Sequence, residues 1–272
     1  MSWHAVRVRP SLDRDGVIAS LFASGSQGVH EDGDSLVTHF PPGTDMDEIR
    51  ADIARADSGA TVEMTVAPTV DWTEAWKHGV KAHELGGLAV VPPWLEGTRD
   101  PARTIVIDPG MAFGTGEHQT TRCVMRLMQR IVRPGDRVAD LGAGSAVLSI
   151  AAAKLGATSV AAIESDPDAI GNAEANVVRN GVSDCVRVIE GDAALLLPLV
   201  APVRVVLANI VSTVLVGLLP SIAAALTPDG QVILSGILVA ERPDMLAVLH
   251  AGWRILGEEA EEKWWSVAIE RA

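Results

Sequence analysis

Cysteine is scarce in this chain, and long apolar runs are absent from it. Its two cysteines, Cys123 and Cys185, lie in apolar surroundings without partners at metal-ligand spacing, so we expect buried free thiols and no metal site. No apolar run is long enough to cross a bilayer without a charged residue, and no basic start leads into an apolar segment. We therefore expect no membrane association and a cytoplasmic location.

Basic residues are also in short supply, because 22 Lys and Arg stand against 35 Asp and Glu, a formal net charge of −13. Such a chain repels phosphate backbones, so we expect no direct nucleic-acid binding. The acidic excess suits a basic partner, but an acidic surface also serves solubility alone, and the composition does not separate the two. The length of 272 residues allows one large domain or two, and we expect two.

The central segment, residues 138–164, has the pattern of a strand, a glycine turn, a helix and a second strand. Gly142 and Gly144 permit a tight turn with close ligand approach, and Ser145 is placed to cap the helix. Glu164 follows the turn by about twenty residues, the spacing at which nucleotide-binding units place the acid that accepts hydrogen bonds from ribose hydroxyls. We predict a nucleoside site; the alternative is an ordinary turn whose acids face water.

A third glycine, which the dinucleotide fingerprint requires, is missing from this turn, and Val147 stands in its place. Asp140, just before the turn, would repel a pyrophosphate. The same carboxylate suits a ligand with a sulfonium and an ammonium group, such as S-adenosylmethionine. The residues therefore favour a methyl donor and count against a dinucleotide-dependent oxidoreductase.

The part before the central segment is predicted to form a separate small domain. Residues 1–68 have the order βαββαβ, a ferredoxin-like α+β pattern without clustered nucleophiles, bases or metal ligands, and we expect a recognition module. Residues 69–100 follow as a linker helix and strand, and residues 101–272 alternate between strands and helices. The small domain's expected elements are strand 3–9, helix 12–23, strand pair 28–40, helix 46–56 and strand 61–67.

A glycine-rich loop, residues 108–121, follows a short predicted strand at 104–107. Its glycines expose backbone amides, Phe113 supplies a flat apolar face, and several side chains supply polar tips. We predict that this loop folds over a ligand, because ordering it without one is costly; the alternative is a flexible connection. The glycines are Gly110, Gly114 and Gly116, and the polar side chains are Thr115, His118, Thr120 and Thr121.

The remaining chain predicts further strands whose carboxyl ends meet at one edge of a sheet, where open α/β sheets bind ligands. Candidate site residues at these ends are Asp140, Gly142, Glu164, Asp192 and Asn209. The expected elements are helices 121–131, 167–180, 214–226 and 242–250, strands 185–190, 203–207 and 231–234, and a terminal antiparallel hairpin around 253–258 and 264–270.

Several motifs give this chain a resemblance to the family of bacterial ribosomal protein L11 methyltransferases. The most specific motif is DPGMAFGTGEHQTT at 108–121, and the others are DWTEAWK, VPPW, DLGAGS, LANI and LSGIL. The resemblance covers nearly the whole chain. It implies a seven-stranded, Rossmann-like class I methyltransferase domain preceded by a ferredoxin-like domain that binds the ribosomal protein.

The resemblance also implies an activity and a set of site residues. The activity is transfer of methyl groups from S-adenosylmethionine to lysine or N-terminal amines of ribosomal protein L11. Thr121, Gly142, Glu164 and Asn209 are implied to touch the cofactor, with Phe113 and the loop Gly114, Thr115 and Gly116 closing over it. We expect Asn209 to orient the accepting amine through its side-chain carbonyl, and we expect Asp140, Gly144 and Asp192 to contribute to the same cofactor site.

Two residues depart from the family pattern. Ala146 stands where the family usually has glycine, and we expect its methyl group to be tolerated in a helical backbone; Glu164 replaces the commoner aspartate and keeps a bidentate acceptor. Two alternatives stay open at this point: a methyltransferase for another protein or a small amine, and a non-catalytic module that kept the nucleotide-binding fold.

Overall fold

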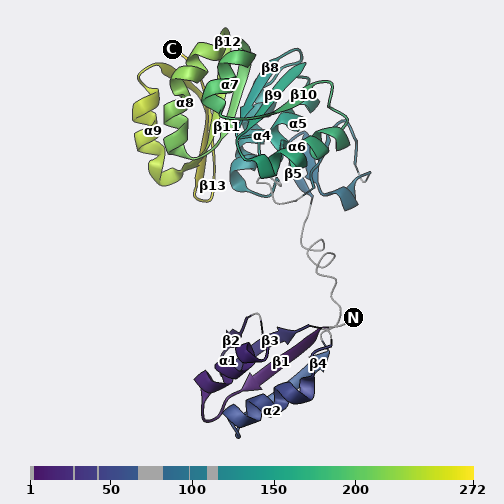
Figure 1. Cartoon of the computed structure of the whole chain (residues 1–272). Helices are drawn as coiled ribbons and strands as arrows, with labels where there is room; N and C mark the ends of the chain where they lie inside the picture. Colours follow the sequence, from purple (N-terminus) through teal and green to yellow (C-terminus); the bar gives the residue numbers. More distant parts are fainter. Residues whose placement is uncertain (1–2, 27, 42, 67–81, 98, 109–115) are drawn as a thin grey trace. The chain divides into compact units, whose positions relative to one another are not determined.

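The chain forms two compact units, Met1–Val80 and Lys81–Ala272, each with its own hydrophobic core (Figure 1). The predicted linker helix after residue 70, and Phe113, Gly114 and Thr115 of the glycine-rich loop, lie outside the described residues. The structure is a computed structural model that describes residues 3–26, 28–41, 43–66, 82–97, 99–108 and 116–272.

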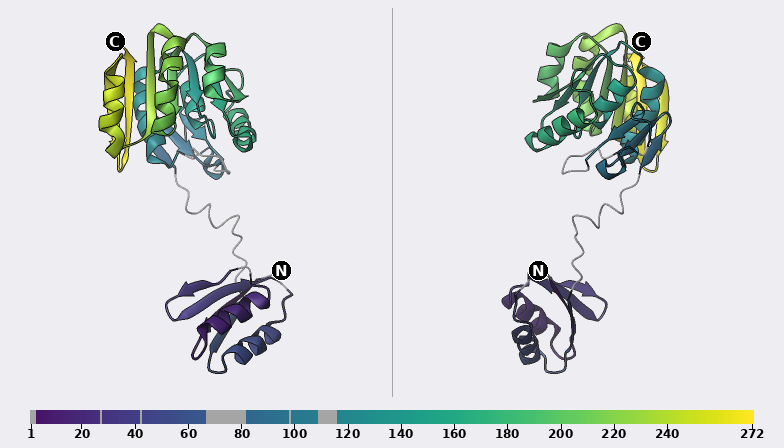
Figure 2. Two further views of the ribbon diagram at one scale, coloured as in Figure 1. Left: turned by 60° about the vertical axis from the view of Figure 1, so that its left-hand side comes forward. Right: turned by 90° about the vertical axis from the view of Figure 1, so that its right-hand side faces the viewer.

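The first unit has the predicted ferredoxin-like fold. Its elements are β1 (His4–Arg9), α1 (Arg14–Ala23), β2 (His30–Asp32), β3 (Ser35–Phe40), α2 (Met46–Ala56) and β4 (Thr61–Val66). The strands form an antiparallel sheet in the order β2-β3-β1-β4, and both helices pack on one face of it (Figure 2).

Side-chain spacing and caps account for these elements. In β1 the alternate residues Val6 and Val8 are buried, and in α2 the buried Ile49 and Ile53 stand one turn apart. The Asp57 carboxylate accepts hydrogen bonds from backbone amides of the β1–α1 connection, at 2.7 Å from that of Leu12. These hydrogen bonds, that of Leu12 first, lower the pKa of Asp57 to about 2, so the connection is held by an ionised side chain.

The second unit contains a seven-stranded sheet in the order β10-β9-β8-β11-β12-β14-β13, so the prediction of a Rossmann-like α/β fold is confirmed. The first five strands of this order are parallel, and β14 is antiparallel to both of its neighbours. The strands are β8 (Arg137–Leu141), β9 (Ser159–Glu164), β10 (Val186–Glu190), β11 (Val203–Asn209), β12 (Leu226–Leu238), β13 (Trp253–Glu261) and β14 (Trp264–Arg271).

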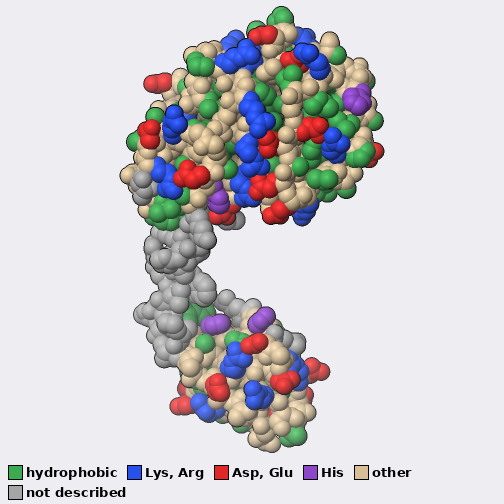
Figure 3. Space-filling view, turned by 180° about the vertical axis from the view of Figure 1, so that it is seen from behind, with side chains coloured by type: hydrophobic (Ala, Val, Ile, Leu, Met, Phe, Trp, Pro, Cys, Tyr) green, Lys and Arg blue, Asp and Glu red, His purple; other side chains and the backbone are tan. Residues whose placement is uncertain are grey.

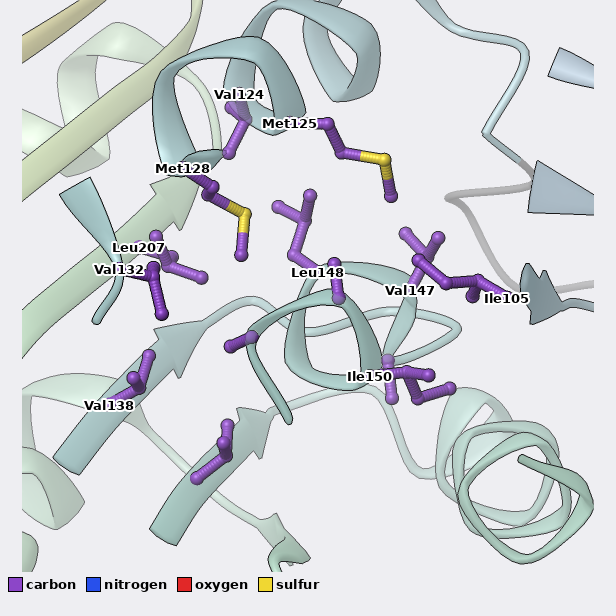
Figure 4. Close-up of a cluster of buried hydrophobic side chains, with 14 of the residues drawn as sticks. Ile105, Val124, Met125, Met128, Val132, Val138, Val147, Leu148, Ile150 and Leu207 are labelled. Carbon is purple, nitrogen blue, oxygen red and sulfur yellow. The ribbon is translucent and has the colours of Figure 1, made fainter. Parts of the chain in front are cut away.

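Helices cover both faces of this sheet. The core between one face and α4, α5 and α6 includes Val124, Met128, Leu148 and Ile150 (Figure 4). The core on the other face contains residues of α7, α8 and α9. The helices are α4 (Gln119–Ile131), α5 (Val147–Lys154), α6 (Pro167–Arg179), α7 (Ala193–Val200), α8 (Ser212–Ala225) and α9 (Arg242–Leu249), with short 3₁₀ turns η2 (Pro93–Leu95) and η3 (Val239–Glu241).

A small three-stranded sheet precedes the large one in the second unit. It consists of β5 (His83–Leu85), β6 (Leu88–Val91) and β7 (Thr104–Val106), in which β5 and β6 form a hairpin and β6 runs parallel to β7. The sequence predicted β6 and β7 but not the hairpin.

Among the described residues, no helix has the length and apolar character needed to cross a membrane. On the face seen in Figure 3, acidic and basic side chains of the second unit are interspersed.

Candidate functional site

A cavity of about 590 Å³ opens where β8, β9, β10 and β11 reach their carboxyl ends. This is the edge at which the sequence predicted a ligand site. The lining is mostly apolar: Gly142, Ile163, Ser165, Gly191, Asp192, Ala193, Ala194, Ile210, Val211, Val214, Gly217 and Leu218. Another cavity, of about 430 Å³, includes Arg137, Thr158 and Arg187 at the opposite ends of the strands and contains none of the predicted site residues.

The glycine turn after β8 is fixed between two neighbouring strands. The amide of Gly142 donates a hydrogen bond to the carbonyl oxygen of Ile163 in β9, at 2.9 Å. Gly142 has a φ of +70°, and a Cβ atom added to it would stand 2.5 Å from Cγ2 of Ile210. Only glycine combines this backbone with this contact, so the turn lies close beside the end of β11.

Glu164 holds the same turn from the end of β9. One oxygen of its buried carboxylate accepts from the amide of Gly144 at 2.8 Å, and the other accepts from Ser165 and Asp166 at 2.7 and 2.9 Å. An ionised carboxylate has about four acceptor positions, so these three amides leave capacity for a hydroxyl group. The bond to Gly144 was not foreseen, although the spacing of turn and acid had placed both groups at one site.

Asp140 does not line the cavity, although the sequence placed it beside the ligand. Its carboxylate is buried under α5, where the Ser149 hydroxyl donates to it at 2.6 Å. Burial raises the pKa of Asp140 to about 6, because the charged form has lost its water. The structure therefore shows Asp140 joining β8 to α5, and its contact with a ligand stays a prediction.

Asp192 follows the carboxyl end of β10, and Asn209 is the last residue of β11. Asp192 lines the cavity and caps α7, with one carboxylate oxygen accepting from the amide of Ala194 at 2.7 Å. Asn209 is half-buried at the end of β11, immediately before the lining residue Ile210. Asp192 is thus placed at the cavity itself, and Asn209 one residue from its wall.

The described end of the glycine-rich loop is anchored away from the cavity wall. Gly116 has a φ of +86°, and an added Cβ atom would stand 2.7 Å from Cγ1 of Val90 in β6, so it requires glycine for packing. Thr121 is buried within the first turn of α4, which begins two residues earlier than predicted, and it is not a lining residue.

His118, one of the polar side chains of the glycine-rich loop, acts as the cap of α4. Its Nδ1 accepts from the amide of Thr120 at 3.3 Å, and its ring lies edge-on to Trp264 with the centroids 5.1 Å apart. Burial first, and then the nearby charges of Arg122 and Lys263, lower the pKa of His118. The neutral ring that this favours is the form able to accept at Nδ1.

Ala146 corrects the sequence prediction at the start of α5. The residue was expected in a helical backbone with Ser145 as the cap, but Ala146 itself occupies the cap position with φ 63° and ψ 19°, and no side chain caps the helix. Ser145 instead offers its carbonyl oxygen to the Asn176 side chain at 3.1 Å. A glycine would adopt this left-handed conformation freely, whereas alanine adopts it only with strain.

The apolar wall from α8 was missed by the sequence analysis. Val211, the cap residue before α8, lines the cavity together with Val214 and Leu218 in the first two turns of the helix. The signal that would have found them is the composition of α8, STVLVGLLPSIAAA, which contains no charged residue although much of it is exposed. An exposed helix without charge points to a surface that meets a ligand or a partner.

Comparisons with known proteins agree on one family. Residues 18–272 match the family described as ribosomal protein L11 methyltransferase (PrmA). A ribosomal protein L11 methyltransferase of Thermus thermophilus is 37% identical over 269 residues, covering 97% of this chain and 98% of the relative. One of Pelotomaculum thermopropionicum is 39% identical over 224 residues, covering 81% and 72%.

A solved structure is similar as well. The crystal structure of a ribosomal protein L11 methylase from Lactobacillus delbrueckii subsp. bulgaricus superimposes with a TM-score of 0.64 at 34% sequence identity. The match covers 71% of this chain and 99% of that chain.

Proposed function

This chain belongs to the ribosomal protein L11 methyltransferase family, and from that premise we propose that its cavity binds S-adenosylmethionine and that it methylates amines of ribosomal protein L11. The observation that supports this proposal most strongly is the hydrogen bond from the Gly144 amide to the Glu164 carboxylate. This bond joins an acid suited to ribose hydroxyls to a turn suited to close ligand approach. The cavity beside this link, about 590 Å³, is within the usual size of cofactor sites.

The cavity and the residues beside it suit the parts of the cofactor. Ile163, Val211 and Val214 line the cavity and offer apolar surface to an adenine ring. Glu164 is not itself a lining residue, but it stands between the lining residues Ile163 and Ser165, and its carboxylate keeps acceptor capacity for the ribose. The Gly142 turn lets backbone atoms approach the methionine end closely. The loop residues Phe113, Gly114, Thr115 and Gly116, together with Thr121, are proposed to complete the site.

Bound S-adenosylmethionine supplies a methyl group that its sulfonium already activates, so the protein has to align a neutral amine and exclude water. A lysine amine has a reference pKa of about 10.4, and an apolar cavity beside a cation favours its neutral form. We assign the alignment to Asn209, whose side-chain oxygen accepts a hydrogen bond from the amine. The amines are those of lysine side chains or the N-terminus of L11.

The first unit is proposed to recognise the protein substrate. In the part of it that the structure describes, the packed residues form a plain hydrophobic core, while the glycine turn, the acid and the cavity belong to the second unit. Binding energy gained on a separate unit is available to position an amine at the cofactor.

The cofactor proposal is tested by calorimetric titration of S-adenosylmethionine into Glu164→Gln. The expected loss is about 10- to 100-fold in affinity, because charge-assisted hydrogen bonds contribute about 1.5–3 kcal/mol. Glu190→Gln is the matched control, since Glu190 is the register partner of Glu164 on β10, is exposed and does not line the cavity. Equal affinities for Glu164→Gln and the parent would contradict the assignment.

The substrate proposal is tested separately by mass spectrometry of purified L11 after incubation with the enzyme and methyl donor. Mass increments of one methyl group or more on lysine or the N-terminal amine are expected. An unchanged L11 mass, with an enzyme that binds the cofactor, would point to a different methyl acceptor.

A further inference from the structure

The first turns of α8 form a wall between two hollows of the second unit. On one side is the cofactor cavity, lined by Val211, Val214 and Leu218. On the other side, toward α9, lies a separate groove of about 240 Å³, which shares no lining residue with the cofactor cavity. Helices α8 and α9 lie beside each other in Figure 1. The groove is lined by Ser212, Thr213, Val216, Glu241, Asp244, Met245 and Val248.

Apolar side chains at this groove are open to solvent. Val216 is 40% exposed and Val248 is 39% exposed, and both line the groove together with Met245. Single exposed apolar residues are ordinary, but two that line one hollow beside a third apolar side chain are typical of a binding surface.

Two acidic side chains stand at the same groove, and none of the described residues that line it is basic. The Glu241 carboxylate is held in place, because it accepts from the Ser212 hydroxyl and the Leu238 amide at 2.8 Å each. Asp244 is exposed in the first turn of α9. Across the described parts of the chain, neither acid takes part in an ion pair.

The nearest basic residue along the chain is directed elsewhere. Arg242 donates to both oxygens of Glu258, at 2.8 and 3.1 Å, and its guanidinium lies over the Trp265 ring at 5.5 Å from the centroid. The negative charges of Glu241 and Asp244 are therefore left for a partner.

We propose that this groove binds the segment of the protein substrate that flanks the methylated lysine, with an apolar side chain between α8 and α9 and a lysine or arginine facing Glu241 and Asp244. The proposal rests on the proposed function. Position supports it, because Ile210 lines the cofactor cavity while Ser212, two residues later, lines the groove. The groove thus begins three residues along the chain from Asn209, to which we assign the alignment of the amine.

Charge supports the same occupant. A ribosomal protein binds RNA phosphates and therefore needs basic residues on its surface, whereas this chain carries a net charge of −13. The apolar lining of the groove suits apolar side chains, and its acidic rim suits basic ones, so the groove fits a segment in which basic and apolar residues alternate. Specificity for the segment around the lysine follows from contacts that the reacting amine itself cannot provide.

The test uses the full chain and steady-state methylation of L11, with Asp244→Lys and Val216→Glu as variants. We expect the KM for L11 to rise about fivefold or more in each variant, because Asp244→Lys removes about one charged contact and Val216→Glu about one apolar contact with L11. The affinity for S-adenosylmethionine and the thermal unfolding temperature should stay at the parent values, because neither residue lines the cofactor cavity.

Two matched controls carry the same chemical changes away from the groove. Asp229→Lys reverses an exposed acid near the start of β12, and Val178→Glu charges an exposed valine of α6, which packs against the opposite face of the sheet. Both should keep the KM for L11 within about twofold of the parent value. A fivefold rise in the controls as well would reveal a general charge effect and overturn the groove assignment.

The remaining outcomes separate the two proposals. If the parent enzyme methylates L11 and both groove variants keep its KM, the groove assignment fails while the proposed function stands. If the parent does not methylate L11, the proposed function fails. A groove occupied by a second copy of the chain would show as a change of mass in sedimentation between parent and variants, and that result would also overturn the assignment.

Discussion

At the scale of single residues, Ala146 is the clearest case of a residue whose side chain disfavours its backbone conformation. It is fully buried with φ 63°, where the strain on an L-residue is about 1 kcal/mol. Ala146→Gly relieves this strain but removes a buried methyl group worth about 0.8 kcal/mol, so we expect the free energy of unfolding to change by less than about 1 kcal/mol. Ala146→Val should lower it by about 2 kcal/mol or more, because a β-branched residue resists positive φ.

Denaturant titration of the three proteins measures these differences directly. The affinity for S-adenosylmethionine should likewise change little in Ala146→Gly and fall in Ala146→Val, because Ala146 stands just after the Gly142 turn. A valine variant as stable as the parent would mean that the left-handed conformation is not present in solution.

His118 gives a pH dependence with a definite sign. Its pKa is lowered in the folded protein, chiefly by burial, so the unfolded chain takes up a proton near pH 6.5 that the folded chain does not. This contribution to stability is present above about pH 6.5 and is lost as the pH falls below it. Protonation also removes the acceptor that binds the Thr120 amide.

We expect the unfolding temperature of the parent to fall more between pH 8 and pH 5.5 than that of His118→Asn, in which the amide oxygen still caps α4. Asp140 acts in the opposite sense, since its pKa is raised to about 6 and its stabilising effect is lost as the pH rises from about 4 to 6. Both proteins contain Asp140, so the difference between them isolates the histidine. Parallel pH curves would rule out the cap.

At the scale of elements, α4 is joined to β13 by a ladder of ion pairs. Arg122, Arg126 and Arg130 recur every fourth residue on one face of the helix, and they pair with Glu259 and Glu261, which share a face of the strand. Arg126 is central, at 3.1 Å from Glu259 and 2.7 Å from Glu261. The ladder fixes the helix that follows the glycine-rich loop.

Arg126→Met should therefore lower the free energy of unfolding by about 1 kcal/mol, with a smaller difference at high salt, because the arginine side chain is only 31% exposed and bridges two acids. Arg254→Met is the control, since Arg254 is 71% exposed and, within the described ranges, forms an ion pair with Glu270 alone. Its effect should be about 0.5 kcal/mol or less. Urea titration at low and high salt separates the two, and equal effects would show that the ladder adds nothing beyond isolated pairs.

Most elements were predictable because local signals agreed with packing. Helix α2 has the predicted bounds, and Asp45 and Asp166, acids that precede the helices, cap α2 and α6. Helix α7 was missed because AALLLPLV has no polar periodicity and contains Pro198. Its existence depends on packing against α8, which no local pattern expresses.

The candidate site was predictable in its location but not in its internal bonds. Strand ends brought Gly142, Glu164 and Asp192 to one edge, as the topology requires. The direction of the Asp140 side chain was not predictable, because a strand residue points to either face and only the placement of Ser149 on α5 decides which. The same holds for Ala146, whose φ depends on the closure of a turn rather than on its own preference.

At the scale of the whole molecule, we expect recognition and chemistry to separate. A chain that begins at Lys81 retains the complete second unit and its cavity, so it should bind S-adenosylmethionine within about threefold of the full-length affinity. It should lose most of its methylation of L11, because the binding energy of the first unit is absent. Labelled-methyl transfer at matched cofactor saturation is the measurement, and equal rates for both chains would remove the docking role of the first unit.

The order of strands in the large sheet bears on how the protein is made. β14 follows β12 and β13 in the chain, yet it lies between them and is hydrogen-bonded to both. During synthesis, β12 and β13 therefore wait with open edges until Trp264–Arg271 has emerged, whereas the four strands of the first unit are complete by Val66. The first unit can fold while the rest is being translated, and the large sheet of the second unit closes late, when a chaperone that shields strand edges is of most use.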